Sequence, residues 1–156
     1  MDNKELIKLF NKHVSAVGFK KTRNNVWYRK GEYVTECIYL QKSMYGNLYY
    51  FRYGYVINEL ELEKGDRYHY GRRTPFSSKE DTLINSLLNL EKEINDQDRD
   101  LQLDKLLQDS LSLDTLHVPK SKNELIDYII TSPWPVNGVL RSYLHIRWEK
   151  DKYIRL

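Results

Sequence analysis

Residues 26–58 read VWYRKGEYVTECIYLQKSMYGNLYYFRYGYVIN and carry the strand pattern from which the fold of this chain is predicted. They are rich in β-branched and aromatic residues, and short polar turns at Lys30–Glu32 and Met44–Asn47 divide them. Because strands joined by short turns pair antiparallel, we predict an antiparallel meander of about four to five strands. The strands expected in it are Val26–Arg29, Val34–Ser43, Leu48–Asn58 and Tyr68–Thr74.

An amphipathic helix is expected before this block. Over residues 4–17, apolar side chains recur at three- and four-residue steps, which places them on one face: Leu6, Ile7, Phe10, Val14 and Val17. Asp2 or Asn3 can cap the start of the helix, and Gly18 follows its end as a left-handed cap residue would. The helix therefore has a face with which to cover the sheet.

Two helices are expected after the strands. Ser77 and Ser78 each begin a capping box, and the apolar positions that follow continue to Ile94. The polar run NDQDRD at residues 95–100 is expected to break this helix. A leucine stripe over residues 101–113 predicts the next one.

The remaining segments are less regular. Ser121 predicts the cap of a fourth helix, which Pro133 and Pro135 end. Residues 138–148 fit both a helix and a strand, and we favour a strand that returns to the sheet. Glu59–Lys64 alternates acidic and leucine side chains, which is typical of a half-buried edge strand.

The order of these elements predicts a single α+β domain over residues 1–156, with an N-terminal helix, the meander, and helices packed on one sheet face. One cysteine in 156 residues excludes an internal disulfide and a zinc site with two or more thiolates. The N-terminus does not resemble a signal peptide, and no apolar run approaches the ~18 residues of a membrane span. We therefore expect a cytoplasmic protein that does not enter a membrane.

Charge is unevenly distributed along the chain. Residues 1–76 carry 14 Lys and Arg against 8 Asp and Glu, whereas residues 77–132 carry 6 against 12. The basic and acidic parts can form two oppositely charged faces, or they can neutralise each other in the fold. Both arrangements agree with the sequence.

No pattern of catalytic residues is present. The four histidines never stand at metal-ligand spacing, and the chain lacks a glycine-rich phosphate loop and a nucleophile elbow. Cys37 lies in the middle of a strand, as a packed residue would. The acidic side chains at 59–66 lack the lysine that a restriction-type nuclease site requires. We predict no catalytic residue, no metal site and no cofactor, and we favour a protein that is not an enzyme.

Tyrosine is the unusual feature of the composition, because ten of the 13 tyrosines fall within residues 28–70. Tyrosine and arginine on a sheet are typical of protein-binding hot spots and of surfaces that stack single-stranded nucleic acid. Tyrosine also suits half-buried strands for structural reasons. The candidate binding residues are Gln41, Ser43, Arg52, Tyr53, Tyr55, Arg72 and Arg73, with Gln41, Ser43 and one arginine of the pair at 72–73 as a polar cluster.

The motifs GFKK at 18–21, YR at 28–29, YLQKS at 39–43, FRYGYV at 51–56 and RR at 72–73 occur in an order that resembles a bacterial family catalogued as domain of unknown function 4304. The resemblance is strongest over residues 5–75. The chain differs at Arg52–Gly54, where an Asn-like or apolar segment is usual in that family. The resemblance supports the fold and implies no activity.

Two functional hypotheses follow. The first is a non-enzymatic protein-binding domain, which presents either the sheet or the acidic helical part to a partner, as immunity and antitoxin proteins do towards basic toxins. The alternative is a domain that binds or processes nucleic acid or nucleotides with a sheet face lined by tyrosine and arginine. The oligomeric state stays open.

Overall fold

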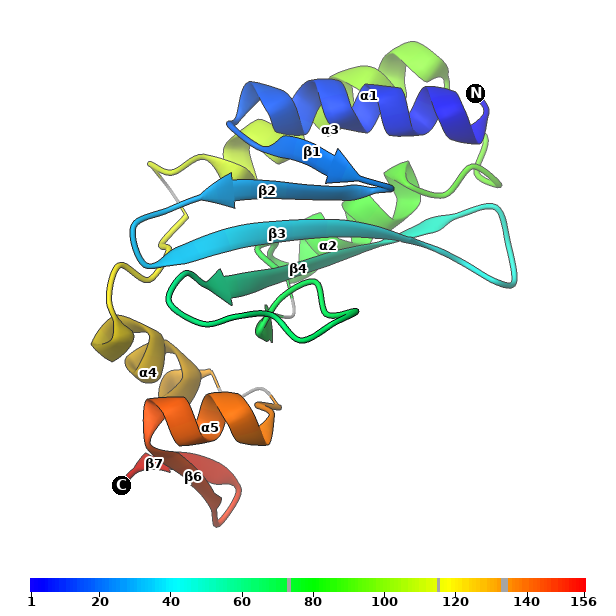
Figure 1. Ribbon diagram of the computed structural model, residues 1–156. Coiled ribbons are helices and arrows are strands. Elements are labelled where there is room, and N and C mark those ends of the chain that lie inside the picture. The colour runs from blue at the N-terminus through cyan, green and yellow to red at the C-terminus, as the bar shows by residue number, and fades with distance from the viewer. Residues whose placement is uncertain (73, 115, 133–134) are drawn as a thin grey trace.

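The computed structural model describes residues 1–72, 74–114, 116–132 and 135–156. Within these ranges it confirms the α+β class and the antiparallel meander, which has five strands in the order of the sequence. Each strand pairs antiparallel with the next (Figure 1). The strands are β1 (Lys20–Arg23), β2 (Val26–Lys30), β3 (Val34–Lys42), β4 (Tyr49–Ile57) and β5 (Tyr70–Arg72).

Helices pack on one face of this sheet. The described residues form α1 (Asn3–Ala16), α2 (Ser78–Leu87), α3 (Asp96–Leu111), α4 (Lys122–Thr131) and α5 (Gly138–Leu144). The first three gather on the face that holds the buried side chains of β4, where α1 contacts β1 and α3, and α2 contacts β4 (Figure 1). None of the described helices has the length and apolar character needed to cross a bilayer.

The first helix docks as its pattern predicts. The Asp2 side chain accepts a hydrogen bond from the Glu5 amide in a capping box, and Gly18 adopts the left-handed φ of 99° beyond the helix end. Phe10 is fully buried, and its ring lies edge-on to Trp27 with 5.0 Å between the ring centroids. The apolar stripe of α1 therefore covers the sheet.

The segment after the sheet differs from the prediction at one junction. The helix expected to continue to Ile94 ends at Leu87, and residues 95–100, expected to be a break, begin α3. Asn95 caps α3, and the buried Arg99 donates hydrogen bonds to the carbonyls of Leu87 and Lys92. Because Arg99 donates to the Leu87 carbonyl at the end of α2, this helix ends seven residues earlier than its apolar pattern indicates.

Two strand predictions are wrong. Residues 59–64 form an irregular loop instead of an edge strand. The strand expected over 138–148 is α5 followed by β6 (Ile146–Glu149), which pairs with β7 (Lys152–Arg155) in a separate two-stranded sheet and does not join the main one. Asn137 caps α5 and His145 ends it at a left-handed φ of 51°, so the chain turns away before it can return.

The C-terminal elements contact the main sheet through tyrosines. Tyr128 of α4 lies 6.2 Å from both Tyr55 and Tyr70, measured between ring centroids, and the Tyr33 and Tyr143 hydroxyls are 2.8 Å apart. Ser121 caps α4 as predicted. Its predicted end at Pro133 lies outside the described residues.

Candidate binding surface on the open sheet face

Helices α1, α2 and α3 all lie on one face of the sheet, and we call the opposite face the open face. It displays the strand positions that alternate with the buried ones: Gln41, Tyr50 and Arg52 are exposed, and Tyr28 and Tyr39 are half-buried. Neighbouring side chains on a strand point to opposite faces, so the burial of Phe51 and Tyr53 places Tyr50 and Arg52 here. The open face is thus polar and aromatic.

The connection between β4 and β5, residues 58–69, lies partly over the open face. The Tyr68 ring rests on Gly54 and Gly71, where an added Cβ would stand 2.5 Å and 3.0 Å from ring atoms. A residue with a side chain would therefore not fit beneath Tyr68 at position 54. A glycine in the middle of a central strand is therefore explained by the close approach of this ring.

His69 fixes the start and the end of the same connection. The Ile57 amide donates to Nδ1 of His69, and Nε2 donates to the Glu61 carbonyl, each over 2.9 Å. This pair of bonds requires the neutral ring with its proton on Nε2. The connection folds into a fixed loop for this reason instead of adding a strand at 59–64.

Two arginines on the open face are held against tyrosine rings. Arg52 donates through Nε to Oε1 of Gln41 over 3.1 Å, and its guanidinium lies 5.5 Å from the Tyr50 ring centroid. Arg67 lies 3.8 Å from the Tyr39 centroid. Its backbone carbonyl accepts a hydrogen bond from the Tyr28 hydroxyl over 3.1 Å. Stacking leaves the edges of both guanidinium groups available for hydrogen bonds.

A shallow pocket of about 320 Å³ lies between these arginines. Its lining is polar and comes from β3, β4 and the connection: Tyr39, Gln41, Arg52, Gly65, Asp66, Arg67 and Tyr68. Among the residues that the structure describes, neither Arg52 nor Arg67 forms an ion pair. The site can therefore offer two cationic groups to an anionic ligand.

The turn between β3 and β4 borders the same face. Ser43 is buried, and its hydroxyl accepts a hydrogen bond from the Tyr45 amide over 3.1 Å, so it shapes the turn. The turn leaves Met44 89% and Tyr45 94% exposed. An apolar pair this exposed, beside a cationic face, is a feature of interaction surfaces.

The structure brings together only some of the predicted site residues. Gln41 meets Arg52, whereas Ser43 contacts the turn and not Gln41. Tyr53 and Tyr55 lie in the core, where the Tyr53 hydroxyl donates to Glu36. Arg72 belongs to β5 through its backbone, and Arg73 lies outside the described residues.

Sequence reasoning missed Arg67 and Tyr68. The sequence pattern predicted strands at 59–64 and from Tyr68 onward, whereas the chain forms a loop there, and only the folded loop carries these two side chains onto the sheet. The nearest signal in the sequence was Gly54, an isolated glycine within a strand pattern, which indicates a close contact but not its partner.

Cys37 lies within the sheet beneath this site and is fully buried. Burial raises the pKa of its thiol from 9.0 to about 12, so the thiolate needed for nucleophilic chemistry is scarce near neutral pH. Within the described ranges, no three His, Cys, Asp or Glu side chains converge as metal ligands would. The cationic and aromatic groups of this arrangement suit the binding of an anionic ligand.

Comparison with protein families matches residues 10–134 to a family described as "Domain of unknown function (DUF4304)". No curated protein and no solved structure matches the chain.

Proposed function

Since the chain belongs to the DUF4304 family, whose description assigns no activity, we propose from its own surface that it is a non-enzymatic protein-binding domain. The open face would dock a partner segment that presents carboxylates. The observation that carries this proposal is the pair Arg52 and Arg67, each stacked on a tyrosine and neither paired with a carboxylate among the described residues.

Pre-positioned arginines favour binding for two reasons. Ring stacking already restricts the Arg67 side chain, so less conformational entropy is lost when a carboxylate binds. Arginine also recognises a carboxylate through two parallel hydrogen bonds, and arginine and tyrosine are enriched among residues that dominate binding energy.

The exposed turn favours a protein partner over a nucleic acid. Met44 and Tyr45 offer apolar contacts that a phosphate backbone does not use, and they stand at the end of the hairpin that carries Gln41 and Arg52. A protein segment can satisfy both features at once, with a carboxylate at the arginines and an apolar side chain at the turn.

Nucleic acid is the second candidate, because tyrosine rings with arginines on a sheet also stack unpaired bases. Arg67 over Tyr39 is the observation that favours it. Binding of this kind weakens steeply as salt concentration rises.

An immunity-like function would instead use the acidic helical part against a basic partner. The exposed carboxylates of α3 include Asp98 and Asp109. Part of the acidic charge of α3 is compensated, since the Asp100 carboxylate lies 3.7 Å from the Lys12 ammonium of α1; the same carboxylate forms a hydrogen bond with His13 over 2.6 Å. We therefore place the principal partner surface on the open face.

The test compares partner capture by the tagged wild-type chain and by the double variant Arg52→Gln, Arg67→Gln. Each tagged protein is cross-linked to its partners in lysate of the native host, and the eluates are quantified by mass spectrometry and by absorbance at 260 nm. The matched control is Arg141→Gln with Arg147→Gln, which removes two exposed arginines from α5 and β6. We expect one protein to be lost with the first pair and retained with the second. Nucleic acid lost in that pattern would favour the second candidate, and equal capture by both variants would refute a role for the open face.

A further inference from the structure

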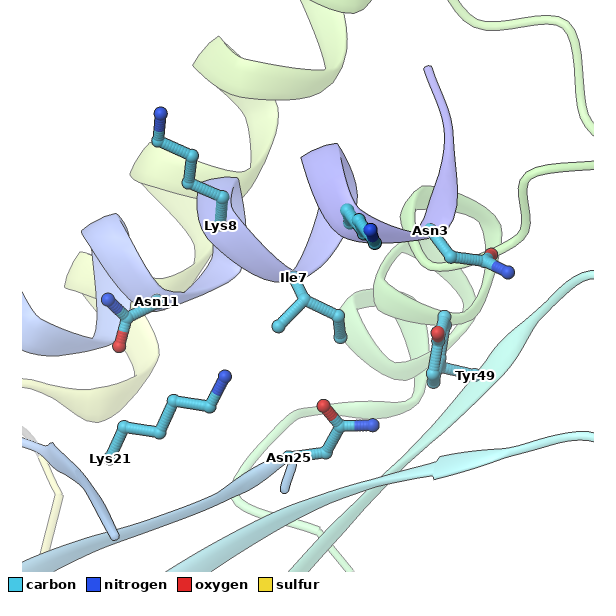
Figure 2. Close-up of a pocket in the computed structure, with 8 residues that line it drawn as sticks. Asn3, Ile7, Lys8, Asn11, Lys21, Asn25 and Tyr49 are labelled. Carbon is cyan, nitrogen blue, oxygen red and sulfur yellow. The ribbon is translucent and has the colours of Figure 1, made fainter. Parts of the chain in front are cut away.

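A second pocket lies on the helix-covered side of the sheet, between α1 and the edge of the sheet at which β1 lies. Its volume is about 450 Å³, and it is lined by residues of α1, β1, the β1–β2 turn and the start of β4 (Figure 2). None of the open-face residues contributes to it. Its chemistry is therefore separate from that of the proposed partner surface.

The charged groups of this pocket are all cationic. Lys4 and Lys8 come from successive turns of α1, and Lys21 comes from β1. No carboxylate lines the pocket, and within the described part of the chain none of these lysines forms an ion pair. Figure 2 shows the Lys21 side chain extended from β1 towards α1, whereas Lys8 points away from the centre towards the outer rim. The pocket thus attracts anions from two elements at once.

A fourth lysine stands at the rim. The Lys42 ammonium lies 2.6 Å from Oδ1 of Asn47 and 3.5 Å from Oδ1 of Asn3, and 5.0 Å from the ring centroid of Tyr49. Asn3 and Tyr49 both line the pocket. Lys42 is therefore held at its edge by neutral partners, which leave its positive charge uncompensated.

Neutral polar groups complete the walls. Oδ1 of Asn11 accepts a hydrogen bond from the Trp27 indole over 2.8 Å, which fixes that amide. Asn25 occupies the β1–β2 turn at a left-handed φ of 57°, and its carbonyl accepts the Leu40 amide over 2.9 Å. Figure 2 shows its side chain directed up from the turn. The side-chain amides of these two asparagines can therefore form hydrogen bonds with a ligand.

The pocket also has an apolar part. Ile7 points down from α1 and Tyr49 points up from its strand, as Figure 2 shows. An apolar strip beside amides and lysines suits a ligand that has an organic body as well as a charged end.

We propose that this pocket binds an organic phosphate of nucleotide size. Lysines from two elements, without a carboxylate, match a multiply charged phosphate group, for which lysine serves as a point charge. The volume falls within the ~300–1,000 Å³ range of small-molecule pockets. The asparagines and the strip of Ile7 and Tyr49 would receive the organic part.

The test is a calorimetric titration at low salt with ATP, using adenosine and inorganic pyrophosphate as the separated parts of the ligand. We expect ATP to bind more tightly than either part. The double variant Lys4→Gln, Lys21→Gln should weaken ATP binding by about a hundredfold, since two charged hydrogen bonds to the phosphate are lost. The matched control is Lys92→Gln with Lys105→Gln, which removes two exposed lysines outside the pocket and should leave ATP binding unchanged.

Circular dichroism of each variant would verify that the fold is intact. Pyrophosphate binding as tight as that of ATP would overturn the organic part of the proposal. Absence of ATP binding at millimolar concentration, or equal binding by the Lys4 and Lys21 variant, would overturn the site. Loss of ATP binding in the Arg52 and Arg67 variant instead would assign the phosphate to the open face.

Discussion

Arg29 and Glu36 form a two-point ion pair inside the core, with Nε to Oε1 and Nη2 to Oε2 both at 2.8 Å. The Tyr53 hydroxyl donates to the same carboxylate over 2.5 Å. Nη1 of Arg29 donates to the carbonyls of Val17 and Leu111, at the C-terminal ends of α1 and α3. One arginine of the sheet thereby anchors two helix ends where the helix dipole favours positive charge.

Replacing Glu36 with Gln should reduce the free energy of unfolding by about 3–5 kcal/mol, because the buried guanidinium loses its counter-charge. Urea unfolding measures the change. The double variant Arg29→Met, Glu36→Leu removes both charges. Its loss of unfolding free energy should be smaller than the sum of the losses in Arg29→Met and in Glu36→Leu alone. Strictly additive losses would contradict the coupling.

Gly54→Ala should destabilise the protein by about 1–3 kcal/mol, because the new methyl group would overlap the Tyr68 ring. In a Tyr68→Ala background the same change should cost much less, which a double-mutant cycle in urea measures. Gly138→Ala is the matched control, since its nearest neighbour atom lies 3.8 Å away. An equal cost of Gly54→Ala in both backgrounds would show that Tyr68 does not lie on this glycine.

Phe10→Ala should cost about 3–5 kcal/mol, as for a fully buried aromatic side chain. The ring contacts both Trp27 and Phe51, so its loss leaves a cavity between α1 and the sheet. Leu101→Ala, at a position 61% exposed, serves as the control and should change the stability by less than ~0.5 kcal/mol. Phe10→Ala with a cost below about 1 kcal/mol would mean that α1 does not dock.

The Cys37 thiol should react slowly with a disulfide reagent in the folded protein and rapidly in urea. Its folded pKa of about 12 exceeds its ordinary 9.0, so the folded state favours the neutral thiol. This contribution to stability is complete below pH 9 and is lost as pH rises from 9 towards 12. Cys37→Ala should remove that part of the alkaline loss, and an identical pH profile would contradict it.

The alternation of side chains in β4 was readable from the sequence. A strand directs alternate side chains to its two faces, and burial shows which set is the core: the set with Phe51 is inside and the set with Arg52 is outside. The sequence does not decide which set is buried, because tyrosine, which suits either environment, occurs in both.

Buried charge explains where local patterns failed. Arg99 occupies a core position at the start of α3, in a polar run that indicates a break. An arginine is accepted there because the carbonyls of Leu87, at the end of α2, and Lys92, in the turn that follows, receive its hydrogen bonds, and both partners lie outside α3. Periodicity describes the residues of one element and contains no information about such partners.

The sequence was enough to predict the class of the fold, the hairpins that join β2, β3 and β4, and the capped helices α1, α2 and α4, because apolar period, turn residues and capping boxes act within a few residues of each other. The candidate binding surface, in contrast, follows from tertiary contacts alone. Arg67 reaches Tyr39 from a loop that follows the next strand, and Lys21 faces α1 across the pocket. These contacts join residues far apart in the chain, and packing of the whole core sets them instead of any local preference.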